Sequence, residues 1–132
     1  MNDLFTKIIN GEVPAFKIYQ NELVTAFLDV HPINKGHTLV VPNQKILKLQ
    51  ELDELSYLHL MKVVRIISLK IEAVFQPPRV AIVVEGFEIA HAHVHVFPAF
   101  KPADLHKSPN QKLSLTSDEM TNIQQMLKIN SL

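Results

Sequence analysis

The sequence contains no cysteine, and this absence excludes several kinds of site at once. Disulfide bonds, zinc sites with thiolate ligands, iron–sulfur clusters and cysteine nucleophiles all need that side chain. Glycine is also scarce, with three residues at positions 11, 36 and 86. This excludes a P-loop and a dinucleotide-binding turn, because both need clustered glycines. Any bound phosphate must therefore be held by other groups.

The sequence also lacks an excess of charge and a long hydrophobic run. Thirteen Lys and Arg balance thirteen Asp and Glu, so no broad positive field is available to bind nucleic acid or an anionic membrane. The longest apolar runs, such as residues 81–84, are far shorter than the ~20 residues that cross a bilayer. Residues 1–11 lack the apolar stretch of a signal peptide. We therefore expect a cytoplasmic protein with neither nucleic acid nor a membrane as partner.

Alternating apolar and polar residues predict an antiparallel sheet of about five strands. The expected strands are a hairpin at residues 16–19 and 23–28, a third strand at 38–41, and a second pair at 79–85 and 89–97. Apolar residues at steps of three and four predict one long central helix over residues 52–75, capped by Asp53 or Ser56.

The rest of the chain predicts a short C-terminal helix after an irregular segment. Thr116 and Glu119 form a capping-box pattern, in which each side chain bonds the other's free backbone N–H. Residues 101–115 show no clear period, so we expect a loop there. No repeat or linker divides the 132 residues, and 47% are hydrophobic, as in a globular chain. The expected fold class is α+β, in a single domain over residues 1–132.

Three of the seven histidines fall within five positions, as His91, His93 and His95. On a strand, alternate side chains share a face and lie ~6.6 to 6.8 Å apart. The spacing therefore predicts three imidazoles on one surface, meeting one substrate, with Ala92 and Val94 facing the core. Imidazole can act as a nucleophile, a general acid or base, a donor to phosphate or a metal ligand.

The spacing alone leaves catalysis and metal binding open, beside the plain alternative of a polar face on an exposed strand. Metal binding is the main rival, because two histidines two positions apart on a strand can chelate one ion. The outer rings start ~13 Å apart, however, which is too far for easy shared coordination. No upstream carboxylate or cysteine cluster completes a ligand set. These observations favour nucleophilic or acid–base catalysis.

Residues 91–97, His-Ala-His-Val-His-Val-Phe, resemble the His-φ-His-φ-His-φ-φ signature of the histidine triad (HIT) proteins, where φ is apolar. Blocks at residues 7–14, 26–29 and 36–42 resemble those of the bacterial branch, in matching order. The resemblance implies a HIT-like fold, which agrees with the expected order of elements. It covers residues 3–98, which we expect to be the core of the domain, with residues 99–132 as a C-terminal tail.

The resemblance implies a hydrolase that binds purine nucleotides and cleaves nucleoside phosphoramidates or related nucleotidyl compounds through a nucleotidyl-histidine intermediate. His93 would attack the α-phosphorus, His95 would donate to phosphate oxygen and assist the leaving group, and His91 would orient the site. No cofactor or metal is implied. A dinucleoside polyphosphate hydrolase and a nucleotide-binding regulatory module with little catalysis are the alternatives. The resemblance also implies a homodimer, paired through the long helix and the strand beside it.

Four further residues match binding positions of the family. Asp29 stands where the family bonds the ribose hydroxyls, and a carboxylate can accept both hydroxyl protons. Phe27 and Val30 resemble the apolar residues that sandwich the base, and His37 aligns with a family histidine close to the triad. Without the resemblance, the same residues could serve as ordinary turn, core and strand-start residues.

Two stretches depart from the family pattern. Asp3, Thr6 and Lys45 stand where many bacterial relatives carry Cys-x-x-Cys and a histidine of a structural zinc site, so we expect no structural zinc. Residues 85–90, Glu-Gly-Phe-Glu-Ile-Ala, replace a Gly-Gln-Ser or Gly-Gln-Thr stretch that touches phosphate in relatives. The Glu88 carboxylate would repel phosphate there unless it points away or binds a leaving-group amine.

Overall fold

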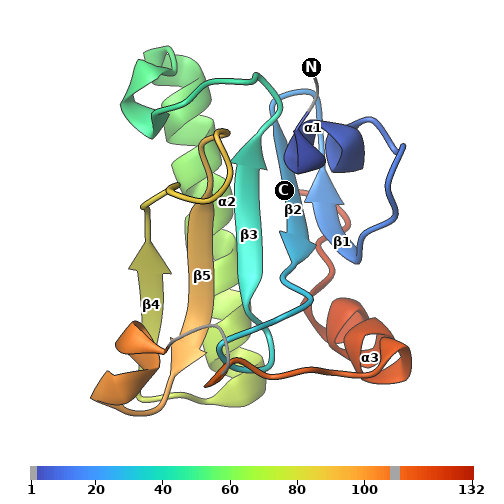
Figure 1. The fold of residues 1–132 in the computed structure, drawn as a ribbon, viewed down its shortest axis with the longest axis vertical. Helices are drawn as coiled ribbons and strands as arrows, with labels where there is room; N and C mark the ends of the chain where they lie inside the picture. The colour runs from blue at the N-terminus through green and yellow to red at the C-terminus, as the bar shows by residue number, and fades with distance from the viewer. Residues whose placement is uncertain (1–2, 108–110) are drawn as a thin grey trace.

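The computed structural model describes residues 3–107 and 111–132, and a five-stranded antiparallel sheet lies at its centre (Figure 1). The strands, in spatial order, are β1 (Lys17–Gln20), β2 (Val24–Leu28), β3 (Thr38–Pro42), β5 (Val94–Ala99) and β4 (Arg79–Val83). The helices of the described residues are α1 (Leu4–Ile9), α2 (Glu54–Phe75) and α3 (Ser117–Leu127), with short 3-10 helices at Leu49–Glu51 and Pro102–His106. In this part of the chain, no helix has the length and apolarity that a membrane span requires. The predicted α+β class with one long and one short C-terminal helix is confirmed.

The two faces of the sheet are buried by different helices. One face packs against α2 through alternate strand residues, namely Ala26, Leu28, Val40, Val94 and Val96. On the other face, Phe27, Leu39 and Val41 pack against Phe5 and Ile8 of α1. Because strand side chains alternate, the odd-numbered residues of β5 lie on the α1 side of the sheet. This alternation places the end of the histidine run on the face opposite the long helix.

Capping groups determine where the predicted helices begin and end. The Asp53 carboxylate accepts from Ser56 N–H (3.2 Å), so α2 begins two residues later than the apolar pattern predicts. The helix ends where Gln76 adopts a left-handed conformation with φ of 51°, just before two prolines. For α3, the predicted capping box is confirmed: Thr116 Oγ1 accepts from Glu119 N–H (3.1 Å), and the Glu119 carboxylate accepts from Thr116 N–H (3.0 Å).

The strand expected at residues 89–97 is wrong at both ends, since β5 begins five residues later and continues two residues further. Residues 89–93 lie outside the sheet, and Ala92 N–H donates to Ile46 O in the β3–α2 connection (2.8 Å). At its far end, β5 runs through Pro98. The last β3–β5 pair is Thr38 with Val96, so Pro98 has only β4 beside it, and proline is tolerated at such an edge.

Helix α1 and both 3-10 helices are absent from the sequence predictions. Helix α1 has six residues, and Asp3 Oδ1 caps it by accepting from Thr6 N–H (2.8 Å). The 3-10 helix Pro102–His106 lies inside the expected loop at 101–115, of which residues 108–110 are outside the described residues. Buried Asp104 holds this helix by accepting from Phe100 N–H (2.8 Å) and Asn34 Nδ2 (3.0 Å). These bonds tie the tail to the connection between β2 and β3.

Candidate active site

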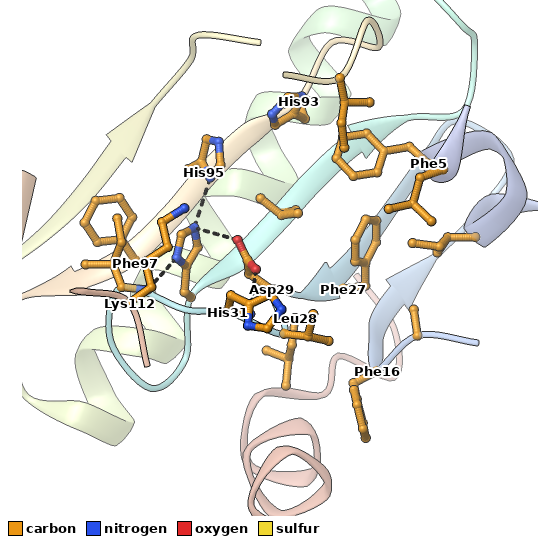
Figure 2. Close-up of a pocket in the computed structure, with 18 of the residues that line it drawn as sticks. Phe5, Phe16, Phe27, Leu28, Asp29, His31, His93, His95, Phe97 and Lys112 are labelled. Carbon is orange, nitrogen blue, oxygen red and sulfur yellow. Dashed lines mark hydrogen bonds and ion pairs between the residues drawn. The ribbon is translucent and has the colours of Figure 1, made fainter. Parts of the chain in front are cut away.

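The sheet face opposite α2 carries a cavity of about 860 Å³, within the size range of small-ligand sites (Figure 2). Strands β2, β3 and β5 contribute its floor, α1 contributes a wall, and residues of the C-terminal tail line it as well. Six of the predicted site residues line the cavity: Phe27, Asp29, Val30, His37, His93 and His95. The structure thus brings together residues that lie up to 68 positions apart in the sequence, between Phe27 and His95.

His37 and His95 are both neutral near pH 7. Burial, together with the charges of His95 and Lys112, lowers the pKa of His37 well below its ordinary value of 6.5. Burial and the neighbouring His93 also lower the pKa of His95, against an opposing effect of Asp29 and Glu85. Each ring therefore carries hydrogen on one nitrogen only.

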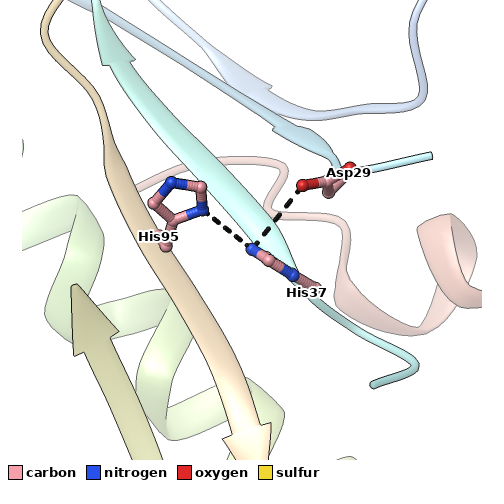
Figure 3. A group of neighbouring side chains, drawn as sticks. All are labelled: Asp29, His37 and His95. Carbon is pink, nitrogen blue, oxygen red and sulfur yellow. Dashed lines mark hydrogen bonds and ion pairs between the residues drawn. The ribbon is translucent and has the colours of Figure 1, made fainter. Parts of the chain in front are cut away.

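The hydrogen bonds of His37, of which the one to His95 is drawn in Figure 3, indicate which nitrogen carries that hydrogen. Ile33 N–H donates to His37 Nδ1 (3.0 Å), so Nδ1 is the unprotonated nitrogen of His37. His37 Nε2–H then donates to His95 Nδ1 (3.0 Å). His95 is consequently protonated on Nε2. The network presents an N–H donor at this atom, beside the cavity.

His93 has the opposite tautomer. Its Nδ1 lies 2.8 Å from the backbone carbonyl oxygen of His91, and a carbonyl can only accept, so Nδ1 carries the hydrogen. In the neutral ring, Nε2 then holds a lone pair. The His93 and His95 ring centroids are 5.0 Å apart. A nucleophilic nitrogen and an N–H donor therefore stand side by side.

The prediction that three imidazoles share one surface is wrong for His91. This ring is fully buried and does not line the cavity. Its Nε2–H donates to Pro42 O (2.8 Å), and its Nδ1 lies 3.1 Å from Asp3 Oδ2. The physical reason is that the residues before β5 leave the sheet, so strand alternation does not apply to them. His91 contributes to the site through its backbone carbonyl, which orients His93.

Asp29 follows the end of β2 and faces the histidine pair. Its Oδ1 accepts from His31 N–H (2.9 Å), and its Oδ2 lies 3.7 Å from His37 Nε2. The side chain is largely buried, with 18% of its surface exposed. His31, in the connection between β2 and β3, also lines the cavity.

A second carboxylate, Glu85, faces the triad from the connection between β4 and β5. Its Oε1 lies 3.8 Å from Nε2 of His93 and 3.8 Å from Nε2 of His95. The same oxygen accepts from Gly86 N–H (2.7 Å). Glu88, the carboxylate singled out in the sequence, lines the cavity too. The carboxylate that contacts the histidines is that of Glu85.

Two groups of side chains in the described residues have the atoms to ligate a metal ion. In Glu85, His93 and His95, and likewise in Asp29, His37 and His95, the ligand-type atoms lie within 4.8 Å of one another. The first group has the two-histidine, one-carboxylate composition found in metal sites. In the second group, His37 and His95 already share a hydrogen bond between the relevant nitrogens.

Helix α1 supplies site residues that the sequence patterns missed. The ring of Phe5 packs edge-on against Phe27 (centroids 5.6 Å apart) and against His93 (4.9 Å). The available signal was apolar Phe5 and Ile8 at helical spacing behind the capping residue Asp3. In a helix of six residues this pattern is too short to stand out.

The C-terminal tail supplies further residues that were missed. Lys107 and Lys112 line the cavity, and Lys112 lies close enough to His37 to lower its pKa (Figure 2). Lys107 is anchored by an ion pair between its Nζ and Asp104 Oδ1 (3.2 Å). No periodic pattern marks this segment, so its place could not be read from the sequence.

The residues around His91 do not fit a structural zinc ion. Asp3 Oδ2 lies 3.5 Å from Lys45 Nζ, and Thr6 Oγ1 lies 3.5 Å from His91 Nδ1. An ammonium group has no lone pair to offer a metal and repels a cation. Burial raises the pKa of Asp3, but the bonds from Thr6 N–H, His91 and Lys45 outweigh this and lower it. The carboxylate is therefore ionised and holds the cluster together itself.

Comparisons with known proteins show the family to which this fold belongs. A model of the HIT domain matches residues 10–102. The chain is 31% identical over 134 residues to an uncharacterized HIT-like protein of Borreliella burgdorferi, covering 96% of each. It is 31% identical over 103 residues to an adenosine 5'-monophosphoramidase of Schizosaccharomyces pombe, covering 74% of this chain and 73% of that protein.

Solved structures show the same fold. A hypothetical histidine triad nucleotide-binding protein from Sulfolobus tokodaii aligns with a TM-score of 0.82 at 29% identity, over 95% of this chain and 89% of that one. A HIT-like protein from Bartonella henselae aligns with a TM-score of 0.83 at 24% identity, over 96% and 93% of the chains. The protein therefore belongs to the HIT family, as its histidine spacing predicts.

Proposed function

We propose that the protein is a nucleotide-binding hydrolase that cleaves nucleoside phosphoramidates through a nucleotidyl-histidine intermediate on His93. The observation that carries this proposal is the pair of opposite tautomers, with a lone pair on His93 Nε2 and a hydrogen on His95 Nε2. A relative named as an adenosine 5'-monophosphoramidase supports phosphoramidates as the substrate class. The HIT family includes hydrolases that bind nucleotides, which supports the broader reaction type.

In the first step, His93 Nε2 attacks the α-phosphorus and the P–N bond to the leaving amine breaks. His95 Nε2–H donates a hydrogen bond to the departing nitrogen, which takes up a proton from solvent and leaves as a neutral amine, while His95 stays neutral. The His91 carbonyl holds the hydrogen on His93 Nδ1, and it stabilises the positive charge that develops on this ring during attack. Donors fixed beside the phosphoryl oxygens stabilise the transition state electrostatically.

In the second step, water attacks the phosphorus of the nucleotidyl-histidine. The proton of that water passes to solvent, which replaces the proton taken up in the first step, and the P–N bond to His93 breaks while His95 keeps its Nε2 hydrogen. The products are a nucleoside monophosphate and the restored enzyme. Because His37 remains neutral and donates to His95 Nδ1, it keeps the active tautomer of His95 in place.

The remaining lining residues suit a nucleoside. We propose that Asp29 binds the ribose hydroxyls, because it follows β2 next to the histidines and one of its oxygens, Oδ2, points toward them. The apolar side chains of Phe27, Val30 and Phe5 would hold a purine base. This orientation places the base toward α1 and the α-phosphate at His93.

We also propose that the protein forms a homodimer through β4 and the exposed side of α2. Among the described strands, β4 is paired on one side only, with β5. Exposed apolar side chains gather on these two elements and beside them: Leu55, Leu58, Leu69, Ile82 and Val84. Burial of such side chains between two copies would drive association.

The enzymatic proposal is tested with a fluorogenic adenosine phosphoramidate, with and without a chelator. Wild-type protein should release the amine at a rate that the chelator does not change. His93→Ala should lose turnover while keeping its melting temperature and its affinity for AMP. His59→Ala is the matched control, because His59 lies on α2 and bonds Asn21 away from the cavity.

Retained turnover in His93→Ala would remove His93 as the nucleophile. A rate abolished by the chelator would instead indicate a metal at the histidines. If wild-type protein binds AMP but cleaves no phosphoramidate, the phosphoramidase proposal fails. Dinucleoside polyphosphates and a binding-only role would then be the next hypotheses.

A further inference from the structure

Glu85 brings a negative charge close to the nitrogens of His93 and His95 that face the cavity. Its Oε1 is equally distant from Nε2 of His93 and of His95, at 3.8 Å. A reacting phosphorus must approach His93 Nε2 to about 3–3.5 Å before attack. The Glu85 carboxylate therefore flanks the phosphoryl group and the first atoms beyond it. Its side chain is 38% exposed, so it also meets the solvent through which a leaving group departs.

The charges around the histidines come from three parts of the chain, of which the end of β2 supplies Asp29, on the side assigned above to the ribose. The cations that line the cavity come from the C-terminal tail and are Lys107 and Lys112. The positive charge of Lys112 lowers the pKa of His37 and that of His95. The carboxylates Glu85 and Glu88 come from the β4–β5 connection. Of these two, Glu85 is the one that approaches both histidines of the cavity floor, His93 and His95. A substrate bound at His93 thus meets negative charge on the β4–β5 side.

This arrangement discriminates between substrates by the charge of the group attached beyond the α-phosphate. Every nucleotidyl substrate carries the same α-phosphoryl charge, so repulsion between that group and Glu85 is common to all. A leaving group with further phosphates adds negative charge within a few ångströms of the carboxylate. A leaving amine with an ammonium tail adds positive charge in the same place. At such separations a charge pair near a protein surface is attractive or repulsive enough to change relative rates measurably.

We propose that Glu85 is a specificity-determining residue that selects positively charged leaving groups and rejects anionic ones. This inference rests on the phosphoramidase function proposed above, and it assigns the charge of the preferred leaving group. The substrate class is a nucleoside phosphoramidate whose amine carries a second, cationic group. Dinucleoside polyphosphates are disfavoured by the same carboxylate.

Three adenosine phosphoramidates test the inference, because they share the reacting P–N bond and differ only in the charge at the end of the amine. Their tails are a primary ammonium, a neutral alkyl group of the same length, and a carboxylate. The measured quantity is kcat/KM for each, at low and at high salt. For wild-type protein we expect the ammonium substrate to exceed the carboxylate substrate by about 10-fold or more at low salt. Added salt should reduce this ratio, because the groups are partly exposed.

Glu85→Gln removes the charge and keeps an oxygen that can accept from Gly86 N–H. In this variant the ratio between ammonium and carboxylate substrates should fall to about 2-fold or less, and its salt dependence should disappear. Glu72→Gln is the matched control, because it removes one negative charge from the exposed surface of α2, across the sheet from the cavity. Its ratio should equal that of wild-type protein.

Each outcome bears on a different claim. An unchanged ratio in Glu85→Gln, or equal kcat/KM for all three tails in wild-type protein, would overturn the role of Glu85 and leave the phosphoramidase function standing. No cleavage of any of the three substrates by wild-type protein would overturn the phosphoramidase function itself, and the role of Glu85 with it. Thermal melting of each variant checks that both substitutions leave the fold intact.

Discussion

At the scale of single residues, backbone groups determine what each histidine can do. His93 bonds a backbone carbonyl through Nδ1, whereas His37 bonds a backbone N–H through Nδ1. The first contact requires a hydrogen on Nδ1 and the second forbids it. A histidine side chain is therefore a nucleophile at position 93, whereas at position 37 it is a hydrogen-bond donor to His95. The conformation of the backbone near Ile33 and His91 is therefore part of the chemistry.

Asp3 should position His93 without touching the cavity. It caps α1, pairs with Lys45 and holds His91, whose carbonyl orients His93. We expect Asp3→Ala to lower the free energy of unfolding by about 1–3 kcal/mol, since it removes a helix cap and the partner of a buried imidazole. It should also lower kcat several-fold with little change in KM. Chemical denaturation and steady-state kinetics measure the two effects.

Asp118→Ala provides the comparison for Asp3→Ala. Asp118 lies exposed in the first turn of α3, so its removal changes the net charge equally without touching the His91 cluster. Restoration of kcat in Asp3→Asn, which keeps an oxygen at the cap, would support a positioning role. Wild-type stability and kcat in Asp3→Ala would show that the cluster has no such role.

At the scale of elements, the β2–β3 connection meets the end of α2 at one glycine. Gly36 has φ of +99°, and a Cβ placed on it would lie 2.5 Å from Cε2 of Phe75. We expect Gly36→Ala to destabilise the fold by about 2–4 kcal/mol, from backbone strain and from displacement of the Phe75 ring. Urea denaturation measures this loss. Because His37 is the next residue, activity should fall with stability.

Gly11→Ala separates the two causes. Gly11 also has positive φ, +80°, but a Cβ there would have no atom within 4 Å. It should therefore show the backbone strain alone, at about 1 kcal/mol. Equal losses in the two variants would mean that the contact with Phe75 contributes nothing.

The elements that could be predicted are those whose pattern repeats. The strand alternation and the apolar stripe of α2 each extend over several residues, so the α+β fold could be inferred from the sequence. The predictions of secondary structure failed where contacts between distant residues determine the conformation rather than the local pattern of apolar and polar residues. Residues 89–93 look like a strand, yet Ala92 N–H bonds the β3–α2 connection instead of a neighbouring strand. Helix α1 is stable through its contacts with Phe27 and His93, which no local pattern reports.

The same distinction applies to the site. The triad spacing and the short blocks around Asp29 and His37 pointed to residues that the fold does bring to one cavity. The displacement of His91 could not be foreseen, because it depends on where β5 begins. Lys107 reaches the cavity because buried Asp104 holds it, and Lys112 reaches it beside Leu113, whose N–H donates to Pro32 O (2.8 Å); both are contacts between distant parts of the chain.

At the scale of the whole molecule, buried ionisable groups make stability depend on pH. In the unfolded chain His37 takes up a proton near pH 6.5, but burial keeps it neutral in the folded state until a much lower pH. Below pH 6.5 the unfolded state therefore binds more protons, and the free energy of unfolding should fall as the pH is lowered. His95 acts in the same direction. Urea denaturation from pH 8 to pH 5 measures the slope, which His37→Gln should reduce and His106→Gln, on an exposed residue, should not.

A second loss should occur at more acid pH. Burial raises the pKa of Asp104, but the bonds from Phe100 N–H, Asn34 and Lys107 outweigh it and lower the pKa to about 2. Its stabilisation, about 2 kcal/mol, is complete above the unfolded value of 3.8 and disappears as the pH falls toward 2. For His37, a free energy of unfolding that does not change between pH 8 and pH 5 would contradict its neutral, buried state in the folded protein.

The proposed homodimer is also a property of the whole molecule. We expect a dimer by size-exclusion chromatography with light scattering. Ile82→Lys, which places a charge on the exposed side of β4, should shift the protein toward monomer. Met126→Lys introduces the same charge on α3, away from β4, and should leave the dimer intact. A wild-type monomer at micromolar concentration would contradict the proposal.

The most direct test of the proposed mechanism is to trap the covalent intermediate. Wild-type protein is mixed with excess adenosine phosphoramidate, quenched within one turnover at neutral-to-alkaline pH, and digested, and the peptide containing residues 91–97 is sequenced by mass spectrometry. We expect an adenylyl group on His93 and on neither His91 nor His95, and none in His93→Ala. An adenylyl group on another residue, or full turnover by His93→Ala, would contradict a nucleophilic His93.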